Sequence, residues 1–200
     1  MNYLIEPIEH ELEIKKSKFI TYLFPVDSEI EAKQLLSTIK KQHPKANHHC
    51  SAMIIDEVVR SSDDGEPAST AGLPMLQTLQ GEEMNHLLAI TVRYFGGTKL
   101  GKGGLIRAYS QSVSEALKSA TYYVEKKISL YLVTTDFSLM HVIESKAESI
   151  IHRDFGEKAT FTLEVYDPTI LDEFVELTAG SVQITHLEDV LRLIPKVTGQ

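Results

Sequence analysis

The sequence predicts an α/β (α+β) fold of two domains, because strand-like and helix-like segments alternate along its 200 residues and the strand pattern restarts between residues 122 and 127. Its 42% hydrophobic and 24% charged residues are typical of a globular chain that buries a core. No apolar run approaches the roughly 18 residues of a membrane helix, so no membrane contact is expected. The chain starts without an export-signal pattern and Cys50 is its single cysteine, which indicates a soluble, cytoplasmic protein.

The first domain is expected to span residues 1–122. A strand over 19–26 is rich in aromatic and β-branched residues, and Ser28 with Glu31 matches a capping box that begins a helix. That helix should end near His43, because Pro44 disfavours helix in the residue before it. The other elements expected in this domain are strands over 48–55 and 87–95, a short helix over 73–79 and a long helix after residue 104.

Residues 122–127 are expected to form the domain boundary, and the second domain to span 128–200. Strands are predicted over 128–135, 150–154, 160–166 and 182–187, with one helix after the first strand and another after the third. Asp167 should cap the second helix, since Pro168 suits its first position and Gly180 follows its end. The order β-α-β-β-α-β predicts a ferredoxin-like domain.

The formal charge of −8 is unevenly distributed along the chain. Up to Ala120 there are 13 Lys and Arg against 15 Asp and Glu, whereas the remaining residues hold 7 against 13. Between Glu83 and Glu115 there is no acidic residue, and this interval contains several cations. Because the local field steers an anionic ligand more than the net charge does, the first domain is the better candidate for an anion site.

A glycine-rich, basic loop lies between the last strand and the long helix of the first domain. Glycines let backbone N–H groups turn toward a ligand, and the start of a helix adds free donors and a partial positive charge. The residues expected to bind an anion or nucleic acid are Arg93, Gly96, Gly97, Lys99, Gly101, Lys102, Gly103, Gly104 and Arg107. An alternative is that the glycines only permit tight turns and close helix–strand packing.

Two nucleotide-binding motifs come close to matching this loop. Gly96 and Gly101-Lys102 reproduce the G-x-x-x-x-G-K of a P-loop, but Gly103 stands where a Ser or Thr should hold Mg²⁺. The dinucleotide motif G-x-G-x-x-G is absent, because Ile106 occupies the position of its third glycine. Neither motif predicts a nucleotide-hydrolysing or redox enzyme, and no cofactor is expected.

Several longer motifs resemble the signature of the YigZ/IMPACT family. They are Lys16-Ser17-Lys18-Phe19-Ile20, His48-His49-Cys50, Asp63-Asp64-Gly65-Glu66-Pro67-Ala68-Ser69-Thr70-Ala71-Gly72, Arg93-Tyr94-Phe95-Gly96-Gly97 and Leu100-Gly101-Lys102-Gly103-Gly104-Leu105. The resemblance covers essentially the whole chain. It implies an N-terminal domain similar to the second domain of ribosomal protein S5 and a ferredoxin-like C-terminal domain. Eukaryotic relatives regulate translation by interfering with the activation of a kinase, a role we do not transfer because no RWD-like region is evident here.

The acidic motif has several interpretations. The residues concerned are Asp63, Asp64, Gly65, Glu66 and Thr70. Carboxylates so spaced could hold a divalent cation or serve as acid and base. They could instead form an Asp-Gly turn stiffened by Pro67, or face the basic loop and order it. For Cys50, burial as a small residue is favoured over a nucleophilic role, and Tyr94 and Phe95 are expected in the core.

The leading hypothesis is a non-enzymatic, translation-associated protein that contacts RNA or ribosome phosphates through the glycine-rich loop, with no catalytic residue and no resident metal. The first alternative is an enzyme or sensor that binds a phosphorylated small molecule at the same loop, with Asp63, Asp64 and Glu66 as a metal site. The second is a regulator that binds a protein partner through the acidic C-terminal domain.

Overall fold

The computed structural model describes residues 1–196, which form two compact units. Met1–Val124 and residues 194–196 form the N-terminal unit, and Glu125–Leu193 form the C-terminal unit. The end of the described chain returns to the N-terminal unit, where the Lys196 amide donates to the Tyr122 carbonyl at 2.7 Å. Within the described residues, no helix is both long enough and apolar enough to cross a membrane.

The N-terminal unit is built on a five-stranded sheet with antiparallel pairing between its neighbours. Its strands, in spatial order, are β1 (Ile8–Ile14), β2 (Ser17–Pro25), β5 (Leu87–Tyr94), β3 (His48–Ile55) and β4 (Val58–Ser62). The three central strands are almost continuously buried. Both faces of the sheet must therefore be covered.

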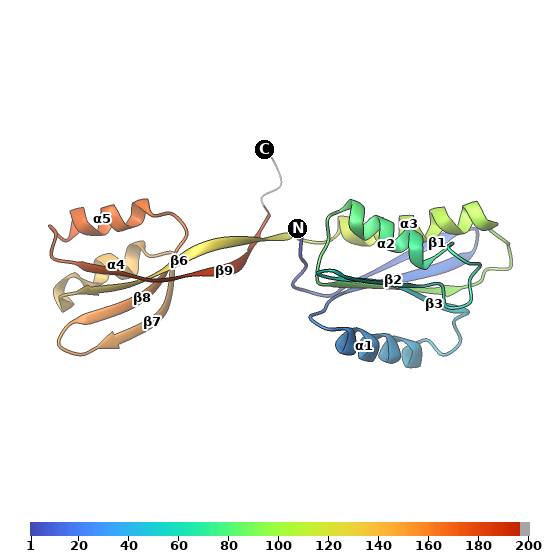
Figure 1. The fold of residues 1–200 in the computed structure, drawn as a ribbon, viewed down its shortest axis with the longest axis horizontal. Helices are drawn as coiled ribbons and strands as arrows, with labels where there is room; N and C mark the ends of the chain where they lie inside the picture. The colour runs from blue at the N-terminus through green and yellow to red at the C-terminus, as the bar shows by residue number, and fades with distance from the viewer. Residues whose placement is uncertain (197–200) are drawn as a thin grey trace. The chain divides into compact units, whose positions relative to one another are not determined.

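Helices cover the two faces of this sheet (Figure 1). Helix α1 (Glu29–Gln42) lies on one face, and α2 (Gly72–Gly81) and α3 (Lys102–Lys118) lie on the other. Because side chains alternate along a strand, β2 contributes to both cores. Phe19 and Leu23 pack in the core shared with α2 and α3, whereas Ile20 and Tyr22 pack in the core under α1.

Two strands of this unit were not predicted from the sequence. In β1, exposed glutamates alternate with half-buried residues that include His10, and β4 is mostly exposed. Both strands lie at the edges of the sheet. Each therefore has one neighbouring strand, and the backbone N–H and C=O groups along its other side do not pair within the sheet. The turn between β1 and β2 places Lys15 and Lys16 at positive φ (48° and 65°), without the glycine or asparagine that usually marks such a turn.

The C-terminal unit has the ferredoxin-like order predicted from the sequence. Its sheet runs β7 (Ser149–Phe155), β8 (Ala159–Val165), β6 (Tyr123–Thr135) and β9 (Gln183–Pro195) in space. Helix α4 (Met140–Lys146), preceded by a 3₁₀ turn (Phe137–Leu139), follows β6, and α5 (Thr169–Leu177) follows β8. Both helices lie on one face of the sheet (Figure 1), over a core that includes Val133, Phe161 and Phe174. The α+β fold class is thereby confirmed.

Helix α5 differs slightly from its predicted start. Asp167 accepts a hydrogen bond from the Thr169 amide at 3.0 Å, but the helix begins at Thr169, one residue later than expected. Gly180 has φ 76° and its amide donates to the Val175 carbonyl at 2.8 Å. That left-handed conformation after the helix is the reason for a glycine at this position.

We expect each unit to fold by itself, because each has its own hydrophobic core. Fragments 1–124 and 125–200 should both give folded circular dichroism spectra and cooperative thermal melts. The first fragment should melt below the full chain, since it lacks the backbone bond from Lys196 to Tyr122. Two unfolded fragments would mean that the cores depend on each other.

Candidate functional site

A buried ion pair lies at the centre of the N-terminal unit. Arg93, on β5, and Glu66, in the loop before α2, are 5% and 8% exposed. Arg93 Nη1 donates to Glu66 Oε1 at 2.5 Å, and the Tyr109 hydroxyl of α3 donates to the same oxygen at 2.8 Å. The interaction joins the sheet, the acidic loop and α3 through one carboxylate.

The β1–β2 turn packs directly against the start of the glycine-rich loop. Ser17 Oγ accepts a hydrogen bond from the Gly96 amide at 3.1 Å and a long one from Arg93 Nη2 at 3.5 Å. A side chain at Gly96 would overlap the backbone of Lys16. Close packing therefore requires a glycine at position 96. For this position, the interpretation that the glycines permit tight packing is correct.

Asp63 organises the acidic loop rather than presenting a free carboxylate. Its two oxygens accept hydrogen bonds from the amides of Ser69, Ala71 and Gly72 at 2.8, 3.0 and 2.9 Å. The Thr70 hydroxyl donates to the Pro67 carbonyl at 2.6 Å. Asp63 thus caps the start of α2 from outside the helix.

Asp64 is likewise engaged by neighbouring groups. It forms an ion pair with Lys40 of α1 at 2.7 Å and accepts a hydrogen bond from the His49 amide at 2.7 Å. Partial burial opposes ionisation of this carboxyl, but Lys40 and the His49 amide outweigh it and hold the pKa of Asp64 below its ordinary value. Gly65 follows with φ 87°, which completes the expected Asp-Gly turn.

The three carboxylates of the acidic motif are each engaged by groups of the protein. Asp63 caps backbone, Asp64 pairs with Lys40, and Glu66 pairs with Arg93. Over residues 1–196, no group of three or more His, Cys, Asp or Glu side chains is arranged to hold a metal ion. Asp63, Asp64 and Gly65 form the Asp-Gly turn of the second interpretation, and Glu66 faces the basic segment through Arg93.

A cleft of about 510 Å³ opens beside the ion pair. It is lined by Asn47, His48, Glu66, Pro67, Arg93, Phe95, Lys99, Leu100, Gly101, Lys102 and Leu105. Five residues singled out from the sequence are among them, namely Glu66, Arg93, Lys99, Gly101 and Lys102. The others lie outside the lining, namely Asp63, Asp64, Gly65, Thr70, Gly96, Gly97, Gly103, Gly104 and Arg107.

The start of α3 forms the basic wall of this cleft. Gly101 precedes the helix with φ 73°, and no side chain of the described residues caps it. The first amide bonded along the helix is that of Leu105, which donates to the Gly101 carbonyl at 2.9 Å. The amides of the three residues before Leu105 are therefore free of intrahelical bonds, and the helix dipole adds positive potential there.

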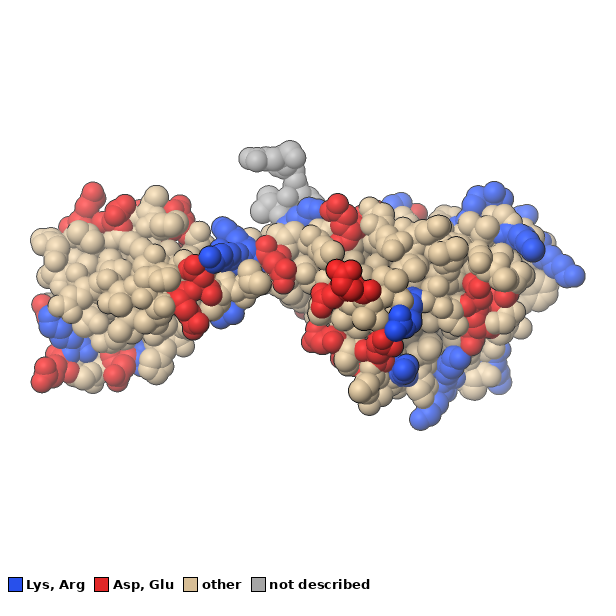
Figure 2. Space-filling view, viewed as in Figure 1, with Lys and Arg blue, Asp and Glu red and all other residues tan. Residues whose placement is uncertain are grey.

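Lys99 and Lys102 are exposed, and neither forms an ion pair within the described part of the chain. Arg107 lies one turn further on, with a guanidinium nitrogen 3.8 Å from the position of a Cβ on Gly103. Lys and Arg atoms gather at the end of the N-terminal unit where α3 begins (Figure 2). Arg93, by contrast, is neutralised by Glu66, so the potential of the cleft comes from the lysines and the helix end.

The sequence predicted Phe95 in the core, and this prediction is wrong. Its side chain is 45% exposed and lines the cleft. Tyr94, one residue earlier, is half-buried and its hydroxyl bonds His43 Nδ1 at 2.9 Å. Phe95 follows the end of β5, where strand alternation no longer fixes which side chains face the core, so the pattern of the strand could not place it.

His48 is a second lining residue that the sequence did not connect with the basic loop. Its Nδ1 lies 2.9 Å from the Asp64 carbonyl, which can accept but not donate, so Nδ1 carries a proton. In the neutral ring the lone pair is then on Nε2, 3.8 Å from Glu66 Oε2. The motif that contains His48 was visible in the sequence, but its proximity to Glu66 depends on the β3–β5 pairing.

Cys50 is buried behind the site. Its thiol donates to the Asp63 carbonyl at 3.1 Å and lies 3.3 Å from the Tyr109 hydroxyl. Burial raises the pKa of the Cys50 thiol to about 12, with the nearby carboxylates adding to the effect. A nucleophilic cysteine needs a lowered pKa and access, and Cys50 has neither.

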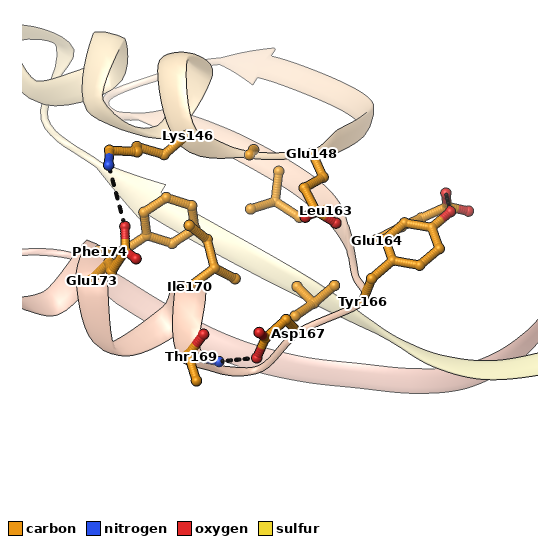
Figure 3. Close-up of a pocket in the computed structure, with 12 residues that line it drawn as sticks. Lys146, Glu148, Leu163, Glu164, Tyr166, Asp167, Thr169, Ile170, Glu173 and Phe174 are labelled. Carbon is orange, nitrogen blue, oxygen red and sulfur yellow. Dashed lines mark hydrogen bonds and ion pairs between the residues drawn. The ribbon is translucent and has the colours of Figure 1, made fainter. Parts of the chain in front are cut away.

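A smaller groove of about 180 Å³ lies in the C-terminal unit, between the ends of α4 and β8 and the start of α5 (Figure 3). Phe174 and Ile170 form part of its wall, and Lys146 forms an ion pair with Glu173 at 3.4 Å across it. Acidic side chains are visible over α5 (Figure 2). That this acidic unit binds a protein partner remains a prediction.

Removing the buried carboxylate should destabilise the N-terminal unit strongly. Glu66→Gln keeps a side chain of nearly the same shape beside Arg93 but removes its negative charge. Leaving one partner of a buried ion pair without its counter-charge lowers the free energy of unfolding by about 3–5 kcal/mol. The control is Lys18→Ala, which breaks the exposed pair with Glu11 and should cost no more than about 1 kcal/mol. Urea unfolding of both variants measures the difference, and equal losses would contradict the assigned role of Glu66.

Cys50 should be unreactive in the folded protein. With a pKa of about 12, the thiolate fraction at pH 8 is roughly one in ten thousand. Labelling with a thiol reagent at pH 8 should be slow under native conditions and complete within minutes in denaturant. Rapid labelling of the native protein would show that the thiol is accessible and activated.

Several known proteins are similar to this chain in sequence and in fold. A model of the Impact N-terminal domain matches residues 15–117. The chain is 37% identical to IMPACT family member YvyE of Bacillus subtilis (strain 168), covering 93% of each chain, and 34% identical to IMPACT family member YigZ of Escherichia coli (strain K12), covering 92% of this chain and 96% of the relative. A crystal structure of "an hypothetical protein" is 32% identical with a TM-score of 0.60, covering 94% of this chain and 97% of that one. The motifs that converge around Arg93 and Glu66 are thus set in a chain that belongs to the IMPACT family.

Proposed function

We propose that the chain is a non-enzymatic, translation-associated protein that binds RNA, including ribosomal RNA, by contacting phosphates in the cleft at the start of α3. The observation that carries the proposal is the pairing of two exposed lysines, Lys99 and Lys102, with the uncapped first turn of the helix. Free amides and unpaired ammonium groups at one place are suited to a phosphate.

The charge distribution around the cleft supports this proposal. Glu66 is the acidic residue in the lining, and Arg93 already neutralises it at 2.5 Å. The first turn of α3 contains no acidic residue. An incoming phosphate therefore meets a net positive field despite the formal charge of −8 on the chain.

The chemistry of the site supports binding rather than catalysis. Cys50 is buried with a raised pKa, and the carboxylates of Asp63 and Asp64 are engaged by backbone amides and Lys40. The translational part of the proposal rests on the IMPACT family, whose eukaryotic members regulate translation. Their action on a kinase is not part of the proposal.

Binding should depend on salt as phosphate contacts do. If Lys99, Lys102 and Arg107 each neutralise one phosphate, log affinity for single-stranded RNA should fall with log salt at a slope of about −2. Lys99→Ala combined with Lys102→Ala should flatten that slope by about 1 to 1.5 and weaken all sequences alike. Fluorescence anisotropy with labelled RNA across a salt series measures both.

The matched control is Lys33→Ala combined with Lys41→Ala. It removes the same charge from α1, which covers the opposite face of the sheet (Figure 1). This variant should keep the wild-type slope to within about 0.5. A salt-independent signal, or equal affinities for the cleft variant and the wild type, would exclude the cleft as the phosphate site.

A further inference from the structure

We propose that the cleft receives one nucleotide of a single-stranded RNA, with the base stacked on Phe95 and the adjoining phosphate held by Lys99, Lys102 and the start of α3. This rests on the proposed function and specifies its ligand. It adds a sequence-tolerant base contact to the phosphate contacts already described.

Phe95 is both exposed and held in place. Its side chain is 45% exposed, yet its amide donates to Asn47 Oδ1 at 2.8 Å. The Arg93 guanidinium carbon lies 5.6 Å from the centre of the Phe95 ring, so a buried cation supports the ring within the protein. An aromatic side chain has only two rotatable bonds, so it loses little conformational entropy when a base stacks on it.

Arg93 lines the cleft with a guanidinium that is already engaged by Glu66 and Ser17. It is 95% buried and lines the cleft, but its Nε has no hydrogen-bond partner among the residues that the structure describes. That nitrogen is itself buried, and the guanidinium lies over the rings of Phe19 and Phe95, so Arg93 supports the proposed stacking ring and leaves the phosphate to the lysines.

The lining of the cleft matches a nucleotide better than a bare phosphate. Apolar side chains from Pro67, Phe95, Leu100 and Leu105 share it with Lys99 and Lys102. A phosphate alone gains nothing from apolar walls, whereas a nucleotide has an apolar aromatic face next to a charged group. The volume of about 510 Å³ is in the range of small-ligand sites.

The position of Phe95 favours a single strand over a duplex. In a duplex the base faces are covered by neighbouring bases, and only phosphates and groove edges can be reached. In a single strand a base can turn out and stack on an exposed aromatic ring, which is worth about 5- to 150-fold in affinity. We therefore expect duplex RNA of the same length to bind only through its phosphates.

The test compares Phe95→Leu with wild type, using an oligoadenylate of about eight nucleotides. Phe95→Leu should weaken binding by about 5- to 150-fold while leaving the salt slope unchanged, because no charge is removed. Its affinity for a duplex of equal length should equal that of wild type. Phe137→Leu, which changes a phenylalanine that is 47% exposed in the C-terminal unit, should bind the oligoadenylate as wild type does.

A second variant gives a direct signal. The chain contains no tryptophan, so Phe95→Trp carries a single one at the proposed stacking position. Saturating oligoadenylate should quench its fluorescence, whereas inorganic phosphate should leave it unchanged. Unchanged emission at saturating oligoadenylate would overturn the stacking proposal, and this holds even if Phe95→Leu fails to fold.

The outcomes separate the two proposals. Wild-type affinity of folded Phe95→Leu, with the salt slope and the lysine dependence intact, would overturn base stacking and leave phosphate binding standing. Loss of the salt slope in wild type would overturn the proposed function itself. Adenosine monophosphate binding as tightly as the oligomer would keep the stacking contact but assign the site to free nucleotides instead of RNA.

Discussion

The ion pair between Arg93 and Glu66 is the constraint on which the N-terminal unit depends. A guanidinium on the central β5 strand would be costly to bury alone, so a loop must bring a carboxylate to it. The acidic loop meets that requirement only because Asp63 fixes its backbone and Tyr109 holds the second contact to Glu66. The loop, the sheet and α3 therefore cannot be positioned independently of one another.

This constraint explains why motifs far apart in the sequence are found together. The β1–β2 turn supplies Ser17 to the Gly96 amide, and the tight packing there excludes any side chain at Gly96. From the end of β5 the chain continues through Phe95 and Gly96 to the basic start of α3. The glycine-rich loop thus has two parts, with close packing at Gly96 and exposed lysines from Lys99 onward.

The sequence predicted the parts of the fold that depend on local pattern. The order of elements in the C-terminal unit and the capping box of α1, where Ser28 accepts from the Glu31 amide at 3.2 Å, follow from periodicity and cap residues. The edge strands β1 and β4 were not predicted, because their residues are half-polar or exposed. In the site, the basic loop was identified, but the burial of Arg93 and the exposure of Phe95 depend on pairing between segments distant in sequence, which no local pattern encodes.

The uncapped start of α3 would couple the proposed phosphate binding to the stability of the helix. A side chain at the start of a helix can accept a hydrogen bond from one of its first amides, as Ser28 does in α1. Helix α3 begins at Gly101 and Lys102 without one among the described residues, so a bound phosphate would serve as its N-cap. The helix would then be completed only when the protein is occupied, and RNA would act as a structural component of the N-terminal unit as well as its ligand.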